Sequence, residues 1–335
     1  MPLVAHSNLP TFKKLAEEGC DVVTPDDAAG FPGAPELHIG FLNLMPDAAL
    51  EATERQFIRL VTAFDQSARL YVHPFTFAEK HHGEAAREHI ATYYENFYEL
   101  QQTGLDAMIV TGANPATSDI TRETFWQPMM EAIEWGRGNV QSILCSCLAT
   151  HAVLKFYHGI ERVRLPQKRW GVYSHRLSAP GHPLLKDTTS PCDGPHSHVF
   201  DVSHEQMEKA GCEILAVSDE AGVYLAVGSD PCDLVFFQGH PEYDAVSLLK
   251  ELKREVMRYT VDERSDYPPF PAHYLPTEAI DVLDAFRQEL VDAKRENISL
   301  PDFPEEAVAP LVANTWSESG RMFYRNWLNT LRPRP

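Results

Sequence analysis

The chain has 335 residues, of which 44% are apolar and 23% are charged, as in an ordinary globular protein with a large core. Its 48 acidic residues against 29 basic ones give a formal net charge of −19. A charge of this sign disfavours binding to nucleic acid and to anionic membranes, but an anionic small substrate needs only a few local cations.

Strand-like and helix-like segments alternate through the first two thirds of the chain, which predicts an α/β fold. We expect a mostly parallel sheet with helices on both faces, and functional residues at the carboxyl ends of its strands. The expected strands are 36–44, 68–77, 105–113, 140–146, 222–229 and 232–244, and the expected helices are 47–64, 122–138, 148–159 and 245–259.

Three parts are predicted along the chain. Residues 1–35 form an N-terminal arm, which covers the active site or contributes to a dimer contact. Residues 36–265 form the α/β catalytic domain. Residues 266–335 begin with the proline cluster "DYPPFPAHYLP", read as a linker, and continue as a helical extension packed on the core, with helices near 277–295 and 315–331.

The chain shows neither a signal peptide nor a run of 18 apolar residues. Its cysteines are too sparse for a disulfide scaffold, and they lie at positions 20, 145, 147, 192, 212 and 232. These observations predict a cytoplasmic protein with reduced thiols.

Cys147 lies in "QSILCSCLATHAVLKFYHG", where an apolar strand ends and a helix begins. Nucleophile elbows use this strand–turn–helix arrangement, and a helix N-terminus stabilises a thiolate. Taken alone, a cysteine at the end of a core strand is more often a packing residue. Cys145 is interpreted as such a residue beneath the turn.

Two other roles for this cysteine pair are weaker. A disulfide between Cys145 and Cys147 would close a very tight ring in a reducing compartment. A metal site would need further ligands, and His196 and His198 of "PHSH" are not joined to the pair by any recognised spacing. We therefore expect no metal.

A second motif changes the interpretation of Cys147. In "VFFQGHPEYD" an apolar strand runs directly into His240, with Glu242 two residues later. A thiolate nucleophile needs a base, and the base needs a carboxylate to hold its tautomer. We predict a catalytic triad of Cys147, His240 and Glu242.

An oxyanion hole follows from this prediction. One donor is the backbone N–H of Leu148, directly after the nucleophile. The other is expected from the "TGA" loop of a neighbouring strand, at Gly112 or Ala113.

With these motifs in place, the chain resembles the homoserine O-succinyltransferases, which have a class I glutamine-amidotransferase-like fold. The resemblance covers roughly residues 36–330, through "FLNLMP", "TERQFIRL", "VTGA", "ATHAVLKFYHGI", "LPQKRWGVYSH", "PHSH", "GHPEYD" and "WSESGRMFYRNWLN". It implies a ping-pong succinyl transfer from succinyl-CoA to L-homoserine in methionine biosynthesis. It also implies a homodimer and no cofactor beyond the acyl-CoA co-substrate.

The resemblance also implies roles for individual residues. Lys168, Ser197 and Arg254 match the family's substrate-binding positions, and a guanidinium suits the α-carboxylate of an amino acid. Without the resemblance, Lys168 and Ser197 would be interpreted as a solvated loop lysine and a turn hydroxyl. The weaker alternative for Arg254 is a helix-surface arginine paired with a nearby glutamate. Ala116, small and neutral, matches the position that governs acyl-donor choice and favours succinyl over acetyl.

Departures from the family pattern leave alternatives open. Asp47 and Ala48 follow "LMP" where a lysine pair is common, Cys147 has unusual neighbours, and His198 replaces an arginine. The alternatives are an O-acetyltransferase acting on homoserine or serine, a glutamine-hydrolysing amidotransferase, and a non-catalytic binding protein. The intact Cys147, His240 and Glu242 argue against the last of these.

Overall fold

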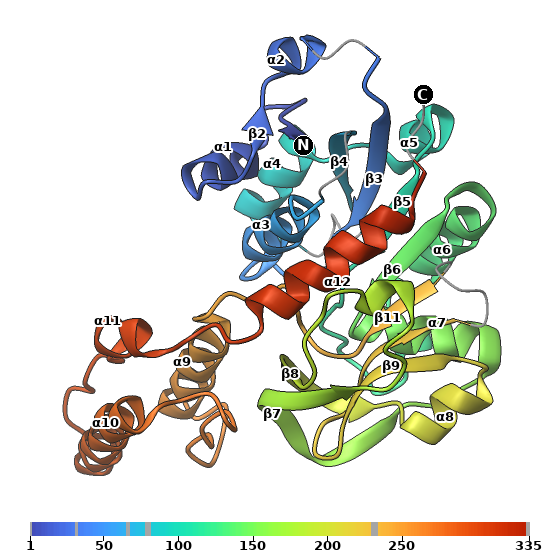
Figure 1. Ribbon diagram of the computed structural model, residues 1–335. Coiled ribbons are helices and arrows are strands. Elements are labelled where there is room, and N and C mark those ends of the chain that lie inside the picture. The colour runs from blue at the N-terminus through green and yellow to red at the C-terminus, as the bar shows by residue number, and fades with distance from the viewer. Residues whose placement is uncertain (1, 31–32, 65–67, 78–81, 229–233, 333–335) are drawn as a thin grey trace.

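A computed structural model describes residues 2–30, 33–64, 68–77, 82–228 and 234–332 (Figure 1). Within these residues one sheet has the strand order β2-β1-β4-β3-β5-β6-β11-β10-β9-β7-β8. The strands are β1 (Leu3–Val4), β2 (Val22–Val23), β3 (Glu36–Leu42), β4 (Arg69–Phe75), β5 (Ala107–Val110), β6 (Ser142–Ser146), β7 (Val163–Leu177), β8 (Cys192–Asp201), β9 (Glu213–Ser218), β10 (Gly222–Val227) and β11 (Leu234–Phe237).

The sheet has a parallel part and an antiparallel part. Every pairing from β2 across to β11 is parallel, and every pairing from β11 across to β8 is antiparallel. The predicted mostly parallel sheet is therefore confirmed. The antiparallel β7–β8 ribbon was not predicted, because "VRLPQKRWGVYSHRL" alternates poorly and contains a proline and several cations.

Helices cover both faces of the sheet, as expected. The helices are α1 (Pro10–Glu17), α2 (Pro25–Ala29), α3 (Leu50–Val61), α4 (Glu84–Tyr93), α5 (Phe97–Thr103), α6 (Trp126–Asn139), α7 (Leu148–His158), α8 (His204–Lys209), α9 (Ser247–Thr260), α10 (Thr277–Glu296), α11 (Glu305–Val308) and α12 (Ser317–Thr330), with 3-10 turns at Ile120–Arg122, Pro183–Leu185 and Ala309–Leu311. Side chains of α1, α3 and α12 share one core cluster, and those of α5, α6, α7 and α8 share another.

Strand β6 shows how the two clusters are separated. Its side chains alternate, so that Leu144 joins the cluster beneath α3 and α12. Ile143 and Cys145 point to the opposite cluster, beneath α6 and α7. The strand is buried on both faces, which explains why it reads as an unbroken apolar run.

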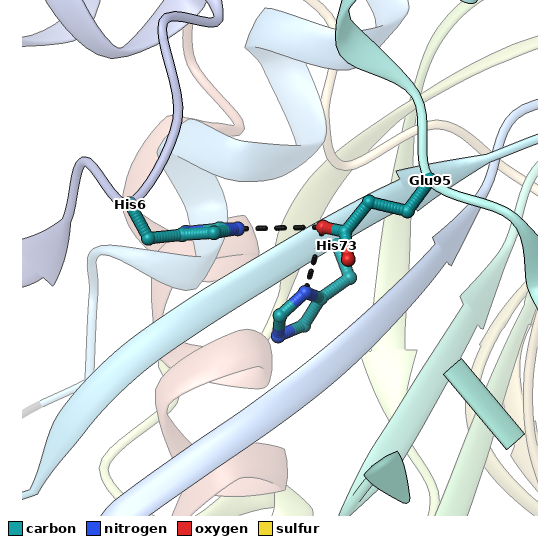
Figure 2. A group of neighbouring side chains, drawn as sticks. All are labelled: His6, His73 and Glu95. Atoms are coloured by element: carbon teal, nitrogen blue, oxygen red, sulfur yellow. Dashed lines mark hydrogen bonds and ion pairs between the residues drawn. The ribbon is translucent and has the colours of Figure 1, made fainter. Parts of the chain in front are cut away.

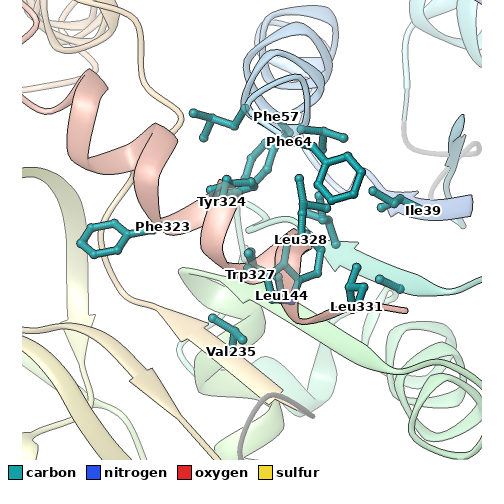
Figure 3. Close-up of a cluster of buried hydrophobic side chains, with 14 of the residues drawn as sticks. Ile39, Phe57, Phe64, Leu144, Val235, Phe323, Tyr324, Trp327, Leu328 and Leu331 are labelled. Carbon is teal, nitrogen blue, oxygen red and sulfur yellow. The ribbon is translucent and has the colours of Figure 1, made fainter. Parts of the chain in front are cut away.

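The C-terminal part returns to the core. Helix α12 crosses the sheet face near β3, β6 and β11, where Ile39, Leu144 and Val235 lie among its side chains (Figure 3). Trp327 is 1% exposed and donates from its indole Nε1 to the Ser142 hydroxyl at 2.9 Å. A helical extension packed on the core is thus present.

The segments on either side of the predicted catalytic domain both pair with strands of the sheet. The predicted N-terminal arm contributes β1 and β2, which extend the sheet beside β4. The proline cluster lies beside the ribbon, where Ala272 donates to the Trp170 carbonyl at 2.8 Å and accepts from Val172 at 2.9 Å. The boundaries at 35 and 265 stay predictions, and residues 229–233, part of two expected strands, lie outside the described residues. None of the helices in the described ranges is both long and apolar enough to cross a bilayer.

Candidate active site

A cleft of about 770 Å³ opens where the carboxyl ends of β5 and β6 meet the ribbon and α9. It is lined by nearly every residue that the sequence singled out: Gly112, Ala113, Ala116, Cys147, Leu148, Lys168, Ser197, His240 and Arg254. Glu242 is 3% exposed and lies behind His240 rather than in the wall.

Cys147 occupies the turn between the end of β6 and the first residue of α7. Its backbone has φ 50° and ψ −107°, a conformation that L side chains rarely adopt. The turn is held by the Cys147 N–H, which donates to the Phe237 carbonyl of β11 at 2.7 Å. This sharp turn is the geometry of a nucleophile elbow, and it leaves Cys147 half-buried at the cleft.

His240 lies three residues after the end of β11 and is held by three contacts. Its backbone N–H donates to the Pro195 carbonyl at 2.8 Å, and its ring stacks on Tyr243 with centroids 4.4 Å apart. Its Nδ1 lies 2.7 Å from Glu242 Oε1, so the Nδ1–H donates to that carboxylate. Nε2 is thereby left for the Cys147 side.

The charge state of His240 follows from these neighbours. Burial lowers the pKa of the imidazole, but the Glu242 carboxylate and the hydrogen-bonded Cys147 outweigh it and raise the pKa well above its usual value. The imidazolium form of His240 is therefore favoured.

The two sites predicted for the oxyanion hole lie against Cys147. Leu148 is the first residue of α7, where backbone N–H groups have no intrahelical partner. A methyl group at Gly112 would lie 3.8 Å from the Leu148 nitrogen and 3.6 Å from Cys147 Cβ. The Gly112 carbonyl accepts from the Thr111 hydroxyl at 2.9 Å, which fixes the orientation of this peptide.

Cys145 differs sharply from Cys147. It is fully buried in the cluster beneath α6 and α7, and burial raises the pKa of its thiol far above the ordinary value. The described cysteines are all free thiols, and Cys232 lies outside the described residues.

Lys168 and Ser197 meet at Glu251, a residue that the sequence reasoning missed. Lys168 Nζ and Ser197 Oγ both donate to Glu251 Oε2, at 2.8 and 2.6 Å. The Tyr243 hydroxyl donates to Oε1 at 2.8 Å. Burial alone would raise the pKa of Glu251. The Lys168 charge and the hydrogen bonds outweigh burial and lower the pKa below its usual value, so the carboxylate is ionised. The signal available was a glutamate on the apolar side of α9, beside Leu252.

Arg254 lies one turn further along α9 and is exposed at the cleft. No carboxylate among the described residues lies within 4 Å of its guanidinium nitrogens. Its acidic neighbours are engaged elsewhere: Glu251 with Lys168, and Glu255 with Arg264. Its charge therefore faces the cleft.

Further cations of the cleft were also missed. Arg162 stacks on the Phe200 ring, with its guanidinium carbon 3.9 Å from the centroid, and donates to the Ser118 carbonyl at 2.9 Å. Burial lowers its pKa, and the nearby Cys147 opposes that shift. Arg164 and Lys250 line the same cleft. Positive charge thus gathers here, although the chain as a whole carries −19.

The departures from the family pattern have structural partners. Asp47 accepts from His82 Nδ1 at 2.6 Å and from the Gly83 N–H at 2.8 Å, and the neighbouring Ala48 lines the cleft. His198 lines the cleft too, with Nε2 3.5 Å from Arg169.

The fold and the site define an α/β protein with a cysteine at a nucleophile elbow beside a carboxylate-oriented histidine. The chain belongs to the homoserine O-succinyltransferase family, whose model matches residues 2–333. It is 50% identical over 331 residues to a homoserine O-succinyltransferase of Methylococcus capsulatus, covering 99% of this chain and 93% of that one. A homoserine O-succinyltransferase of Thiothrix nivea is 50% identical over 328 residues, covering 98% of this chain and 91% of that one.

Solved structures resemble the chain more loosely. A glutamine amido transferase from Methylobacillus flagellatus has a TM-score of 0.49 at 12% identity, covering 90% of this chain and 98% of that one. A glutamine amidotransferase from Thermotoga maritima has a TM-score of 0.44 at 11% identity, covering 88% and 97%. The family assignment rests on the sequence matches.

Proposed function

We propose that the protein transfers a succinyl group from succinyl-CoA to the side-chain hydroxyl of L-homoserine, by a ping-pong cycle through a thioester on Cys147. The observation that carries this proposal is the Cys147 elbow facing the His240–Glu242 pair inside a cleft lined by the residues matching the family's binding positions. Methionine biosynthesis as the pathway and a homodimer as the assembly are proposed from family membership.

In the first half-reaction, the Cys147 thiolate attacks the thioester carbonyl carbon of succinyl-CoA. The tetrahedral oxyanion accepts hydrogen bonds from the Leu148 N–H and from the Gly112–Ala113 segment, which together are worth several kcal/mol, on the order of 3 per donor. The carbon–sulfur bond to coenzyme A then breaks, and the His240 imidazolium protonates the departing thiolate. Succinyl-Cys147 and free coenzyme A remain.

In the second half-reaction, neutral His240 removes the proton from the homoserine hydroxyl. The alkoxide oxygen attacks the succinyl carbon, and the Cys147 sulfur leaves as a thiolate. His240 retains the proton, so the imidazolium–thiolate pair is restored and the cycle balances. Glu242 holds the Nδ1–H tautomer and stabilises the imidazolium throughout.

The acceptor is proposed to lie along α9 and the ribbon. Arg254, which lines the cleft, pairs with the homoserine α-carboxylate. Lys168 and Ser197, fixed by Glu251, line the wall on the same side. No cofactor is required, because the acyl-CoA carries the activated group.

The donor is proposed to be succinyl-CoA because the wall near Ala116 is small and uncharged. A carboxylate-bearing acyl group also suits a cleft that gathers Arg162, Arg164 and Lys250. An acetyl group offers these cations no carboxylate to bind.

Intact-protein mass measured after mixing with succinyl-CoA, with no acceptor present, tests the proposal. A succinyl adduct on Cys147 that homoserine discharges is the expected result. An adduct only with acetyl-CoA would assign an O-acetyltransferase, and discharge by serine alone would reassign the acceptor. Absence of any adduct would overturn acyl transfer and make glutamine hydrolysis the next assay.

Two cysteine variants provide the controls. Cys147→Ser is expected to lose the thioester adduct while keeping its far-UV circular dichroism. Cys145→Ala, two residues away, is expected to label normally because Cys145 is buried and its thiol stays protonated. Equal labelling of wild type and Cys147→Ser would rule out Cys147 as the nucleophile.

A further inference from the structure

A cluster of two histidines and a glutamate lies outside the cleft, at the edge where the N-terminal strands join the sheet. His6 follows β1, His73 lies on β4, and Glu95 lies between α4 and α5 (Figure 2). Their nitrogen and oxygen ligand atoms all lie within 4.8 Å of one another. None of the three belongs to the proposed active site.

The distances suit a shared metal ion. His6 Nε2 lies 3.4 Å from Glu95 Oε1, and His73 Nδ1 lies 2.8 Å from the same oxygen. With metal–ligand bonds of about 2.0–2.1 Å, two ligands of a tetrahedral ion stand roughly 3.3 Å apart. The His6–Glu95 contact already has this spacing, and the His73–Glu95 contact is shorter.

The ligands stand on anchored backbone. His73 pairs with Gly40 in the β3–β4 ladder. The Glu95 N–H donates to the Pro74 carbonyl at 2.8 Å, and the His6 N–H donates to Val4 at 2.9 Å. The Glu95 side chain is 36% exposed, so an ion can enter and keep a water as its fourth ligand.

The hydrogen-bond partners of His6 give a second argument. Its Nδ1 faces the Val4 carbonyl at 3.2 Å, and its Nε2 faces the Glu95 carboxylate. Both neighbours only accept hydrogen bonds, and a neutral imidazole has a single N–H to offer them.

The same count applies to the chain of contacts behind His73. His73 Nδ1 faces Glu95, His73 Nε2 lies 3.0 Å from His38 Nδ1, and His38 Nε2 lies 3.3 Å from Glu36 Oε2. Each of these three contacts calls for one N–H, but two neutral rings carry only two. The ring centroids lie 4.8 Å (His6 to His73) and 5.2 Å (His38 to His73) apart.

We propose that His6 Nε2, His73 Nδ1 and Glu95 bind a divalent transition-metal ion of the zinc type. Such an ion accepts the lone pairs of His6 Nε2 and His73 Nδ1, so neither ring needs a second N–H. Each histidine is then neutral with one proton. His6 Nδ1–H donates to the Val4 carbonyl, His73 Nε2–H donates to His38, and His38 Nε2–H donates to Glu36.

This arrangement also supplies the outer layer that metal-bound histidines use. A ligating imidazole almost always donates its other N–H to an acceptor, which fixes the ring and strengthens the ligand. Here His38 and Glu36 form that relay behind His73, and Tyr71 stacks on His38 with ring centroids 4.7 Å apart. Two imidazoles favour zinc-type ions over Mg²⁺ or Ca²⁺, which prefer oxygen ligands.

The site would fasten the first strand to the sheet. His6 ends the segment that contains β1, whose pairing with β4 is a single residue pair, Leu3 with Leu70. An ion bound by both His6 and His73 would cross-link the two segments at this edge. An ion that binds only the folded protein stabilises it, and the stabilisation grows with ion concentration.

Zinc titration by calorimetry on the tag-free, chelator-treated protein tests the proposal. Wild type is expected to bind one equivalent tightly, to raise its melting temperature with zinc, and to show no such rise with Mg²⁺. His6→Gln and Glu95→Gln are expected to lose that equivalent. His38→Gln is expected to weaken binding by about 10–100-fold, because it removes the outer layer and no ligand.

A matched control uses His273→Gln, in which an exposed histidine hydrogen-bonded to one carboxylate, Glu220, is replaced. It should bind zinc as wild type does. Titration in the Cys147→Ser background removes the active-site thiol as a competing ligand. Melting temperatures in chelator verify that the variants fold, and His6→Gln changes only a residue beside the short first strand. Absence of zinc binding, or equal binding in all variants, would overturn the site.

Discussion

Lys168 Nζ lies 2.8 Å from Glu251 Oε2, which places a cation of the β7–β8 ribbon against a buried carboxylate of α9. The same oxygen accepts from Ser197, and the other oxygen accepts from Tyr243. Since the Tyr243 ring stacks on His240, Glu251 connects the proposed acceptor site to the proposed base. Glu251 is thus a positioning residue.

Glu251→Gln is expected to weaken the acceptor half-reaction more than the donor half-reaction. The amide keeps the size of the side chain but removes the charge that fixes Lys168 and Ser197. We expect homoserine KM to rise about tenfold and stability to fall by about 1.5–3 kcal/mol, the usual value of a hydrogen bond to a charged group. Succinylation of Cys147, followed by mass, should change little.

Glu255→Gln is the control for that variant. Glu255 lies one turn along the same helix and pairs with Arg264 rather than with the cleft. Its kinetics should match wild type. A Glu251→Gln protein with unchanged homoserine KM would contradict the positioning role.

Glu242→Gln is expected to slow both half-reactions, because each passes a proton through His240. Loss of the carboxylate that orients the base costs about 10⁴-fold in a comparable triad, and a fall of roughly 10³–10⁴ in kcat is expected here. The Glu242 charge also raises the pKa of His240, so its loss lowers that pKa. The alkaline limb of the rate profile should therefore move to lower pH.

The pH profile separates catalysis from folding. A variant that merely destabilised the protein would lower the activity without shifting the alkaline limb of the rate profile. Glu220→Gln, whose partner His273 is exposed, should leave both rate and profile unchanged. An unmoved alkaline limb in Glu242→Gln would contradict the assigned pair.

Gly112→Ala is expected to lower activity with little loss of stability. The added methyl group would make only ordinary contacts, 3.6 Å from Cys147 Cβ and 3.7 Å from the Ser146 carbonyl. It would lie 3.8 Å from the Leu148 nitrogen, where the oxyanion is expected. Blocking one donor costs about 10²–10³ in kcat.

The measurement is kcat for succinyl transfer beside a urea titration. Gly138→Ala is a matched control, since a methyl group there meets nothing within 4 Å. It should retain full activity. Normal kcat in Gly112→Ala would contradict the placement of the oxyanion hole beside this residue.

Sequence reasoning placed the Cys147 turn and His240 because both are local events, in which an apolar strand stops at a reactive side chain. The same local signals located most of the parallel strands, although β3, expected over residues 36–44, ends at Leu42. The β7–β8 ribbon was missed because its residues are selected by pairing and not by periodicity. Glu251 was missed because its partners Lys168 and Ser197 lie on strands that are distant from it in sequence.

Buried neutral histidines are expected to make the protein lose stability between pH 6.5 and about 4. His151 donates from Nε2 to Gln238 Oε1 at 3.0 Å, an oxygen that also accepts from the Val202 N–H at 3.1 Å. Burial lowers the pKa of His151 to about 4. His175 has its pKa lowered to about 4 by the same cause, and burial also lowers that of His196.

The direction follows from proton linkage. Below its ordinary pKa of about 6.5 a histidine in the unfolded chain gains a proton that folded His151 does not take up until about pH 4. The unfolded state therefore binds more protons in this window, and the free energy of unfolding falls as the pH falls. Above pH 6.5 the contribution is fully present, and it is lost as the pH approaches the folded value.

His151→Gln tests this, with urea unfolding measured at intervals from pH 7.5 to 4. Glutamine keeps a donor for Gln238 but does not titrate, so the slope of stability against pH should decrease by about one proton, or about 1.4 kcal/mol per pH unit. His273→Gln, at an exposed histidine, should leave the slope unchanged. A slope that is the same in all three proteins would mean that His151 takes up its proton in the folded state as readily as in the unfolded one.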